Sequence, residues 1–140
     1  MSKKSLDALT RIALQHAKAE GEGDLAGTLA TLEADPVYEL YPVGLKLRGM
    51  SGARRYYEYF FAAVAPRIAG YQLISESVGP VGVVQEYDLD ISIGTAPLRR
   101  YRILGILTFG TEALSGERLY ADTALLEFMF ETVWSELVPV

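Results

Sequence analysis

The hydrophobic period of this chain changes at Pro66, and this change limits the folds that it can adopt. Before Pro66, apolar residues recur at helical spacing, most clearly in the stripe formed by Ala53, Tyr56, Tyr57, Phe60, Phe61 and Val64. After Pro66, residues 70–78, 81–93, 98–109 and 113–122 have the pattern of four strands separated by turn residues. Helices followed by a run of antiparallel strands predict an α+β fold in which helices cover one face of a curved sheet.

The remaining elements follow from capping residues and from shorter periodic patterns. Residues 5–20 are predicted to form a helix that ends before Gly21 and Gly23. Asp24 and Ser51 are predicted to cap the two helices that follow. The other predicted elements are helices over 25–33 and 123–137 and short strands over 37–41 and 45–48.

Length and composition restrict the class of protein. The chain has 140 residues, which predicts a single domain over 1–140, and it is 50% hydrophobic, enough for a core with a pocket. The net charge of -5 disfavours nucleic-acid binding. With no cysteine and one histidine, we expect no disulfide, no thiolate catalysis and no metal site. No signal peptide or membrane-length apolar run is visible, so we expect a cytoplasmic protein without membrane contact.

Charges on the predicted strands suggest how those strands pair. Asp90 opposite Arg100 and Asp88 opposite Arg102 would place opposite charges face to face. In the next hairpin, a register that sets Arg100 beside Asp122 would also set Arg102 beside Tyr120. Side chains alternate between the faces of a strand, so these even-numbered residues would share one face and the apolar odd-numbered residues the other.

The charged face has two interpretations. It can be an ordinary solvated face, or it can line the hollow of the sheet. In the second case the row Asp90, Arg100 and Asp122 could activate a water molecule or keep one carboxyl group protonated. Asp122 is also well placed to cap the predicted C-terminal helix, and the two roles can coexist.

Several single residues are candidates for the same pocket. His16 lies on the apolar face of the first helix, either as a core residue or as a group that donates to a ligand oxygen. Tyr57 belongs to a set of nine tyrosines, many for a core alone because buried hydroxyl groups need partners. Glu39 is a charged residue on an apolar strand.

Three segments of the chain resemble the SnoaL-like proteins of the nuclear transport factor 2-like superfamily. The segment from Gly116 to Asp122 resembles the last strand of that superfamily. Gly23-Asp24 resembles the start of its second helix, and Tyr41-Pro42 its strand–loop–helix segment. The resemblance implies a cone-like α+β barrel with a pocket at its wide end and a homodimer formed through the sheet.

The resemblance also implies roles for individual residues. Asp122 matches the acid–base aspartate of the polyketide cyclases, and His16 stands where ketosteroid isomerases have an oxyanion-hole tyrosine. Tyr41 stands where those isomerases keep a general-base aspartate, and a neutral tyrosine cannot serve as that base. Asp90, Arg100 and Asp122 resemble in composition the Asp–Arg–Asp set of limonene epoxide hydrolases.

Together these observations predict a cofactor-independent enzyme that binds a small hydrophobic, oxygenated molecule. The expected reaction is an acid–base isomerisation, cyclisation, dehydration or epoxide hydrolysis. Asp122, Arg100, Asp90 and His16 are the predicted catalytic residues, and the predicted ligand contacts are Glu39, Tyr41, Tyr57, Asp88, Arg102 and Tyr120. The alternative is a non-catalytic ligand-binding or dimerisation module of the same fold.

Overall fold

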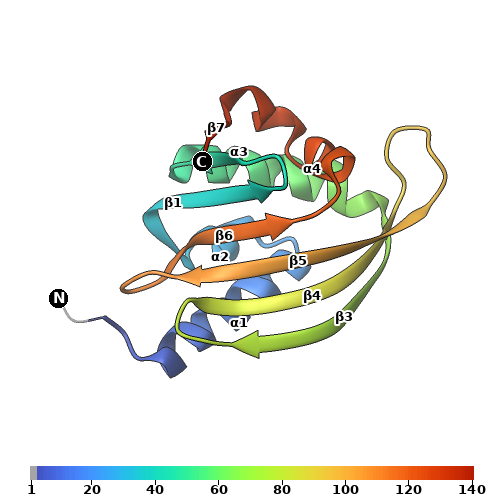
Figure 1. Cartoon of the computed structure of the whole chain (residues 1–140). Helices are drawn as coiled ribbons and strands as arrows, with labels where there is room; N and C mark the ends of the chain where they lie inside the picture. Colours follow the sequence, from blue (N-terminus) through green and yellow to red (C-terminus); the bar gives the residue numbers. More distant parts are fainter. Residues whose placement is uncertain (1–2) are drawn as a thin grey trace.

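The computed structural model describes residues 3–140 and has helices on one side of a single curved sheet (Figure 1). The helices are α1 (Leu6–Gly21), α2 (Leu25–Leu29), α3 (Met50–Tyr59) and α4 (Thr123–Met129). The strands are β1 (Leu32–Tyr41), β2 (Leu45–Arg48), β3 (Ile68–Val78), β4 (Gly82–Ile91), β5 (Arg99–Phe109), β6 (Leu114–Tyr120) and β7 (Val138–Pro139). The predicted α+β class is confirmed.

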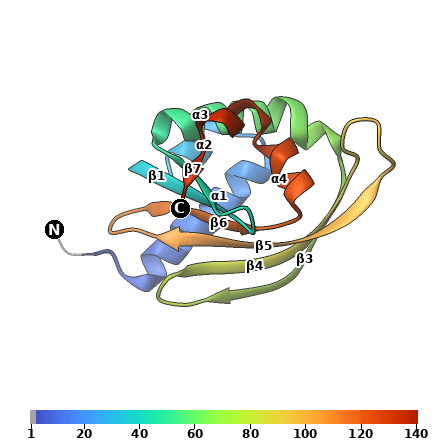
Figure 2. The same ribbon diagram turned by 45° about the horizontal axis from the view of Figure 1, so that its top comes forward.

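The sheet has seven strands in the order β3-β4-β5-β6-β1-β2-β7. All neighbouring pairs described are antiparallel except β1 and β6, which run parallel. Figure 2 shows the sheet bending beneath α1, α3 and α4. The bend leaves the strands β3, β4 and β5 facing α1, with the core between them. No helix formed by residues 3–140 is long and apolar enough to span a bilayer.

Helix α1 begins and ends where the sequence indicates. The Ser5 hydroxyl group accepts a hydrogen bond from the Ala8 backbone N–H at 3.2 Å, and the helix ends at Gly21. The predicted apolar face buries Leu9, Ala13 and His16. Helix α2 is shorter than predicted, because the chain enters β1 at Leu32. Its cap is confirmed: Asp24 accepts from the Gly27 N–H at 2.9 Å.

Helix α3 carries the apolar stripe predicted from the sequence. Ala53, Tyr56, Tyr57, Phe60 and Val64 are all buried. The helix continues as a π-helical segment, Phe60–Val64, and ends in a 3₁₀ turn, Ala65–Arg67. The prediction of Ser51 as the cap is wrong. Gly49 occupies that position with φ 91°, where glycine is favoured, and the Ser51 hydroxyl accepts from Arg55 instead.

The register of β4 and β5 is as predicted, whereas that of β5 and β6 is not. Asp90 lies opposite Arg100 and Asp88 opposite Arg102. In the next pair Tyr120 lies opposite Leu104, two residues from the predicted partner Arg102. The strands are irregular near the β5–β6 turn, where Gly116 adopts φ 144° and a β-carbon at this position would overlap the backbone of Val37. A shift of two residues leaves each side chain on its predicted face.

The C-terminal segment, residues 123–140, packs against α3 and ends beside β2. Instead of one helix over 123–137, α4 is followed by a 3₁₀ segment, Glu131–Glu136, and then by β7, which pairs with β2. Leu126, Met129, Phe130 and Val133 recur at helical spacing in the sequence, and all four are buried. The interruption of the helix therefore does not change which of them are buried.

Candidate active site

The odd-numbered residues of β4, β5 and β6 face the helices and line a cavity of about 430 Å³, together with residues of α1, β3, α4 and the π-helical segment that follows α3. The apolar part of its lining consists of Phe60, Ile68, Leu89, Leu107 and Met129. The polar part consists of His16, Glu20, Tyr71, Gln85, Tyr87 and Glu117. An apolar cavity with a few convergent polar groups is the usual form of a small-molecule site.

His16 is fully buried on α1, and hydrogen bonds fix the proton on its ring. The Thr31 hydroxyl group donates to the Thr28 carbonyl oxygen at 2.6 Å, so it must accept from His16 Nδ1, which lies 2.7 Å away. In the neutral ring Nδ1 therefore carries the hydrogen, and the lone pair of Nε2 faces the cavity. In this orientation Nε2 is a hydrogen-bond acceptor.

The two partners of His16 Nε2 satisfy both protonation states of the ring. The Tyr57 hydroxyl group lies 3.2 Å from Nε2 and donates to it when the ring is neutral. The Tyr38 hydroxyl group, 2.6 Å from that of Tyr57, then donates to Tyr57. When the ring is protonated, Nε2 can donate instead to Glu20 Oε2, also 3.2 Å away. His16 can thus change its charge without losing a hydrogen-bond partner.

Glu117 is the second acidic residue of the cavity and comes from β6, opposite α1. It pairs with Tyr38 of β1 on one side and with Leu107 of β5 on the other, in the row that faces the helices. A side chain at Gly105 would come within 3.0 Å of Glu117 Oε1, so the glycine leaves room for this carboxyl group. Burial raises the pKa of Glu117 well above its usual range, and the charge of Glu20 raises it further. Glu117 is therefore disposed to hold a proton at neutral pH.

The tyrosines around Glu20 and Glu117 are hydrogen-bonding groups and not bases. Burial raises the pKa values of Tyr38, Tyr56, Tyr57 and Tyr87 well above the usual value, and the negative charge of nearby carboxyl groups raises them further. These phenols are therefore neutral at physiological pH and cannot serve as bases. Among residues 3–140, the imidazole and carboxyl groups that line the cavity are those of His16, Glu20 and Glu117.

The same three side chains are the residues of the described chain that come closest to a metal-binding arrangement, with ligand atoms within 4.8 Å of one another. The neutral His16 ring, however, has a single lone pair at Nε2, and the Tyr57 hydroxyl already uses it. A metal ion bound by His16 Nε2 would therefore displace the hydrogen bond from Tyr57.

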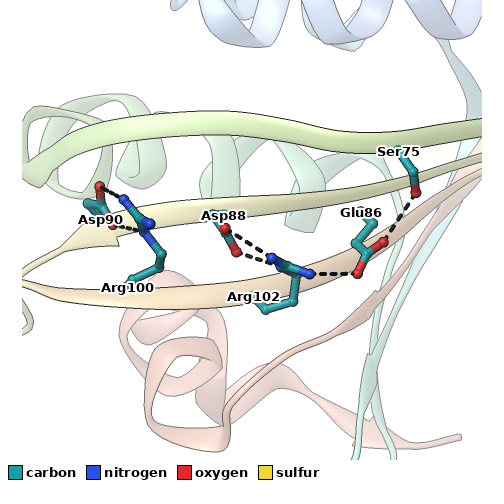
Figure 3. A network of polar contacts seen from close by, with 6 residues as sticks. All are labelled: Ser75, Glu86, Asp88, Asp90, Arg100 and Arg102. Atoms are coloured by element: carbon teal, nitrogen blue, oxygen red, sulfur yellow. Dashed lines mark hydrogen bonds and ion pairs between the residues drawn. The ribbon is translucent and has the colours of Figure 1, made fainter.

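Two of the ten predicted site residues, His16 and Tyr57, belong to this cavity or its hydrogen bonds. The predicted row of Asp90, Arg100 and Asp122 does not form, and its members lie outside the cavity. Figure 3 shows Asp90 paired with Arg100, and Arg102 reaching both Asp88 and Glu86. Leu89 faces the cavity, so Asp88 and Asp90 on either side of it face away.

The carboxyl groups of Asp88 and Asp90 are also in the wrong protonation state for the predicted chemistry. The hydrogen bond from Arg100 holds the pKa of Asp90 below its usual range, and Arg102 does the same for Asp88. Both carboxyl groups are therefore ionised at neutral pH and cannot donate a proton. The interpretation of this face as a set of ion pairs at the surface fits the exposure of the arginines, 63% for Arg100 and 53% for Arg102, although Asp88 itself is buried beside Arg102.

Glu39, Tyr41 and Tyr120 lie together on the outer face of β1 and β6, away from the cavity. The Tyr41 hydroxyl group donates to Glu39 Oε1 at 2.6 Å, and the Tyr41 ring stacks on Tyr120 with 5.0 Å between centroids. Alternation explains this placement, because Tyr38 and Leu40 of the same strand are buried. Dimerisation through the sheet, which would cover these residues, stays a prediction.

Asp122 caps α4 through a hydrogen bond of 2.9 Å from the Ala124 N–H to Oδ1, and it lies 3.9 Å from Arg99. Asp122→Ala should therefore cost about 0.5–2 kcal/mol of stability, whereas Asp122→Asn, which keeps the cap, should cost little. Neither change should alter ligand binding in the cavity. Thermal unfolding and ligand titration of both variants test this expectation. A loss of binding in Asp122→Asn with an unchanged melting temperature would restore a role for Asp122 in the site.

Sequence analysis missed Glu20 and Glu117, although each left a signal. Glu20 follows His16 by four residues, which places both on one face of α1. Glu117 has the same parity as Leu119, so it is an isolated acidic residue on the face predicted to be apolar. A charge that interrupts an apolar face is a better indication of a buried site than a continuous charged row.

Comparisons with known proteins identify the fold. No protein-family model matches the chain, and no curated protein matches it at a significant level. Among solved structures, an NTF2-like protein of unknown function from Cytophaga hutchinsonii has a TM-score of 0.67 at 9% identity, covering 81% of this chain and 99% of that one. A Silicibacter pomeroyi protein described as having a cystatin-like fold has a TM-score of 0.68 at 10% identity, covering 92% and 89%.

A third similar structure carries a functional name. It is a "putative ketosteroid isomerase" from Kribbella flavida, with a TM-score of 0.63 at 13% identity, covering 83% of this chain and 78% of that one. At these identities the likeness concerns the arrangement of helices and strands. The chain therefore has the NTF2-like fold, the cone of helices and curved sheet that its resemblance to the SnoaL-like proteins predicts.

Proposed function

We propose that this chain is an acid–base enzyme that moves a proton within a small hydrophobic molecule held in the cavity. The observation that carries the proposal is the meeting of Glu117, Glu20 and His16 in a cavity whose lining also includes Phe60, Ile68, Leu89, Leu107 and Met129. Two carboxyl groups that differ in environment can act as acid and base at the same pH. Both side chains are partly buried, and they differ in that burial and the charge of Glu20 raise the pKa of Glu117.

The geometry supports a division of roles between the two carboxyl groups. Protonated Glu117 donates a hydrogen bond to a carbonyl oxygen of the substrate, and the carboxylate of Glu20 removes a proton from the neighbouring carbon. The electron pair of the broken C–H bond forms the enol double bond, and the oxygen is stabilised by Glu117. Return of the proton to the same or another carbon regenerates Glu20 and completes an exchange or an isomerisation.

His16 supports this reaction as a positioning residue. Its Nε2 lies 3.2 Å from Glu20 Oε2 and can take up the proton that Glu20 receives. The name of the Kribbella flavida structure, which denotes an isomerase, is consistent with a proton transfer next to a carbonyl group. We assign no role in this reaction to Asp90, Arg100 or Asp122.

Hydrogen–deuterium exchange tests the proposed function. The wild-type protein is mixed with β-tetralone, a small bicyclic ketone, in deuterium oxide, and NMR follows the loss of the protons beside the carbonyl group. We expect exchange above the uncatalysed rate, and a loss of about 10²–10⁴-fold in Glu117→Gln and Glu20→Gln. Asp90→Asn, on the outer face, is the matched control and should exchange like the wild type.

Two results would overturn the proposal. One is binding of the ketone without acceleration of exchange, which favours the alternative of a non-catalytic ligand-binding module. The other is exchange that persists in both glutamine variants, which would place the reaction elsewhere. Circular dichroism of each variant shows whether a loss of exchange reflects a loss of fold.

A further inference from the structure

The cavity described above carries acidic groups and no fixed positive charge. Among residues 3–140, the side chains that line it include two carboxyl groups, Glu20 and Glu117, and no lysine or arginine. The arginines of the sheet, Arg100 and Arg102, point away and are paired with Asp90 and Asp88. An anionic group entering this cavity would lose its hydration and meet two acidic side chains without a compensating cation.

Aromatic rings lie beside the two carboxyl groups. Tyr71 and Tyr87 both line the cavity, with 5.5 Å between ring centroids and 42° between planes. Tyr71 is 59% exposed, so one face of this pair remains free for a ligand. The faces of aromatic rings attract cations, and carboxylates beside them add to that attraction.

We propose that this cavity also binds a small hydrophobic amine in its protonated form. The inference goes beyond the proposed function, since an ammonium group that draws the proton from Glu117 would compete with the carbonyl substrate and not undergo the reaction. The ammonium group would be held between Glu20 and Glu117 near the rings of Tyr71 and Tyr87. The hydrophobic body would lie against the apolar part of the lining, which includes Phe60, Leu89 and Met129.

Binding of such a cation is coupled to proton release. Burial and the charge of Glu20 favour the neutral form of Glu117, whereas an ammonium group beside it favours the charged form. The titratable groups that face Glu117 are His16 and Glu20 from α1, Tyr56 and Tyr57 from α3, Tyr38 from β1 and Tyr87 from β4. None of these supplies a fixed positive charge, so the ligand would supply most of the positive charge that stabilises the Glu117 carboxylate.

A matched ligand series tests the inference with the wild-type protein. β-Aminotetralin, β-tetralone and tetralin-β-carboxylate share one ring system and differ in charge. Isothermal titration calorimetry should give a dissociation constant at least about tenfold lower for the amine than for the ketone, the effect of one charge-assisted hydrogen bond. The carboxylate should bind more weakly than the ketone. Titrations in buffers of different ionisation enthalpy should show proton release with the amine only.

Variants show which groups recognise the amine. Glu20→Gln should reduce the preference for the amine over the ketone about tenfold, and Glu86→Gln, an acidic residue on the outer face paired with Arg102, should leave it unchanged. If Glu20→Gln does not fold, the ligand series on the wild type still decides the question.

The outcomes separate this inference from the proposed function. Equal or tighter binding of the ketone or the carboxylate would overturn the amine assignment, while catalysed exchange of β-tetralone would leave the proposed function in place. Preference for the amine together with no catalysed exchange would overturn the enzyme assignment and would leave an amine-binding protein.

Discussion

Replacement of Tyr56 by alanine is expected to lower the free energy of unfolding by about 3–5 kcal/mol, the usual cost of deleting a large aromatic side chain from a core. The Tyr56 side chain is 3% exposed, and its ring stacks on Phe130 with 4.1 Å between centroids and 10° between planes. It also contacts the rings of Tyr38, Tyr57 and Phe60. Alanine would leave a cavity where α3, β1 and the C-terminal segment meet.

Thermal unfolding measures this loss, which for a chain of this size corresponds to a fall in melting temperature of roughly 10–20 °C. Tyr56→Phe is the matched control, since it keeps the ring and every stacking contact, and it should cost less than about 1.5 kcal/mol. Equal losses in the two variants would show that the hydroxyl group, and not ring packing, is the stabilising feature. No loss in Tyr56→Ala would contradict the packing described here.

The stripe that includes Tyr56 illustrates what the sequence predicts well. Helical contacts depend on spacing within one segment, so the residues that α3 buries could be named from periodicity alone. The pairing of β4 with β5 was also predictable, because opposite charges at two positions favour a single register. The pairing of β5 with β6 was not, because it depends on the unusual backbone at Gly116 and its close approach to Val37.

The site was harder to predict than the fold for a physical reason. Alternation divides a strand into two faces, but only the curvature of the sheet and the position of the helices decide which face encloses a cavity. Asp90 and Arg100 were predicted as site residues because their opposite charges face each other, yet such ion pairs are common on solvated faces. Glu117 has no charged partner on its strands and becomes significant only when α1 brings Glu20 and His16 opposite it.

The orientation of His16 also depends on contacts that are distant in the sequence. Its position on an apolar helix face was visible, but its hydrogen bonds come from Thr31 and from Tyr57, 15 and 41 residues away. These partners decide which ring nitrogen faces the cavity. Periodicity carries no information about such contacts, so the two interpretations of His16 could be separated only by the structure.

Glu117→Gln is expected to make the folded protein more stable than the wild type at alkaline pH and to leave the two equally stable near pH ~4. The reason is that the folded state raises the pKa of Glu117, so in the wild type the folded protein binds this proton more tightly than the unfolded chain does. The associated stability is fully present below the pKa of an unfolded glutamic acid, about 4.3, and is lost as the pH rises through the folded pKa.

Urea unfolding from about pH 4 to pH 9 measures the effect. Across the affected range the wild type should lose up to about 1.4 kcal/mol per pH unit relative to the variant, the slope for one proton. The outer residues Asp88 and Asp90 have lowered pKa values, so they change the stability only at acidic pH. Their effect is the same in both proteins and does not contribute to the difference between them. Glu86→Gln is the control, because its ion pair with Arg102 lies outside the cavity.

The sign of this difference also decides whether Glu117 can act as the proposed acid. A proton donor must retain its proton at the pH of the reaction, and only a site that disfavours the charged carboxylate achieves that near neutrality. If the variant and the wild type lose stability in parallel with rising pH, the cavity accepts the charge of Glu117 at no cost. The carboxyl group would then be ionised in the resting protein, and the acid of the proposed reaction would have to be protonated His16.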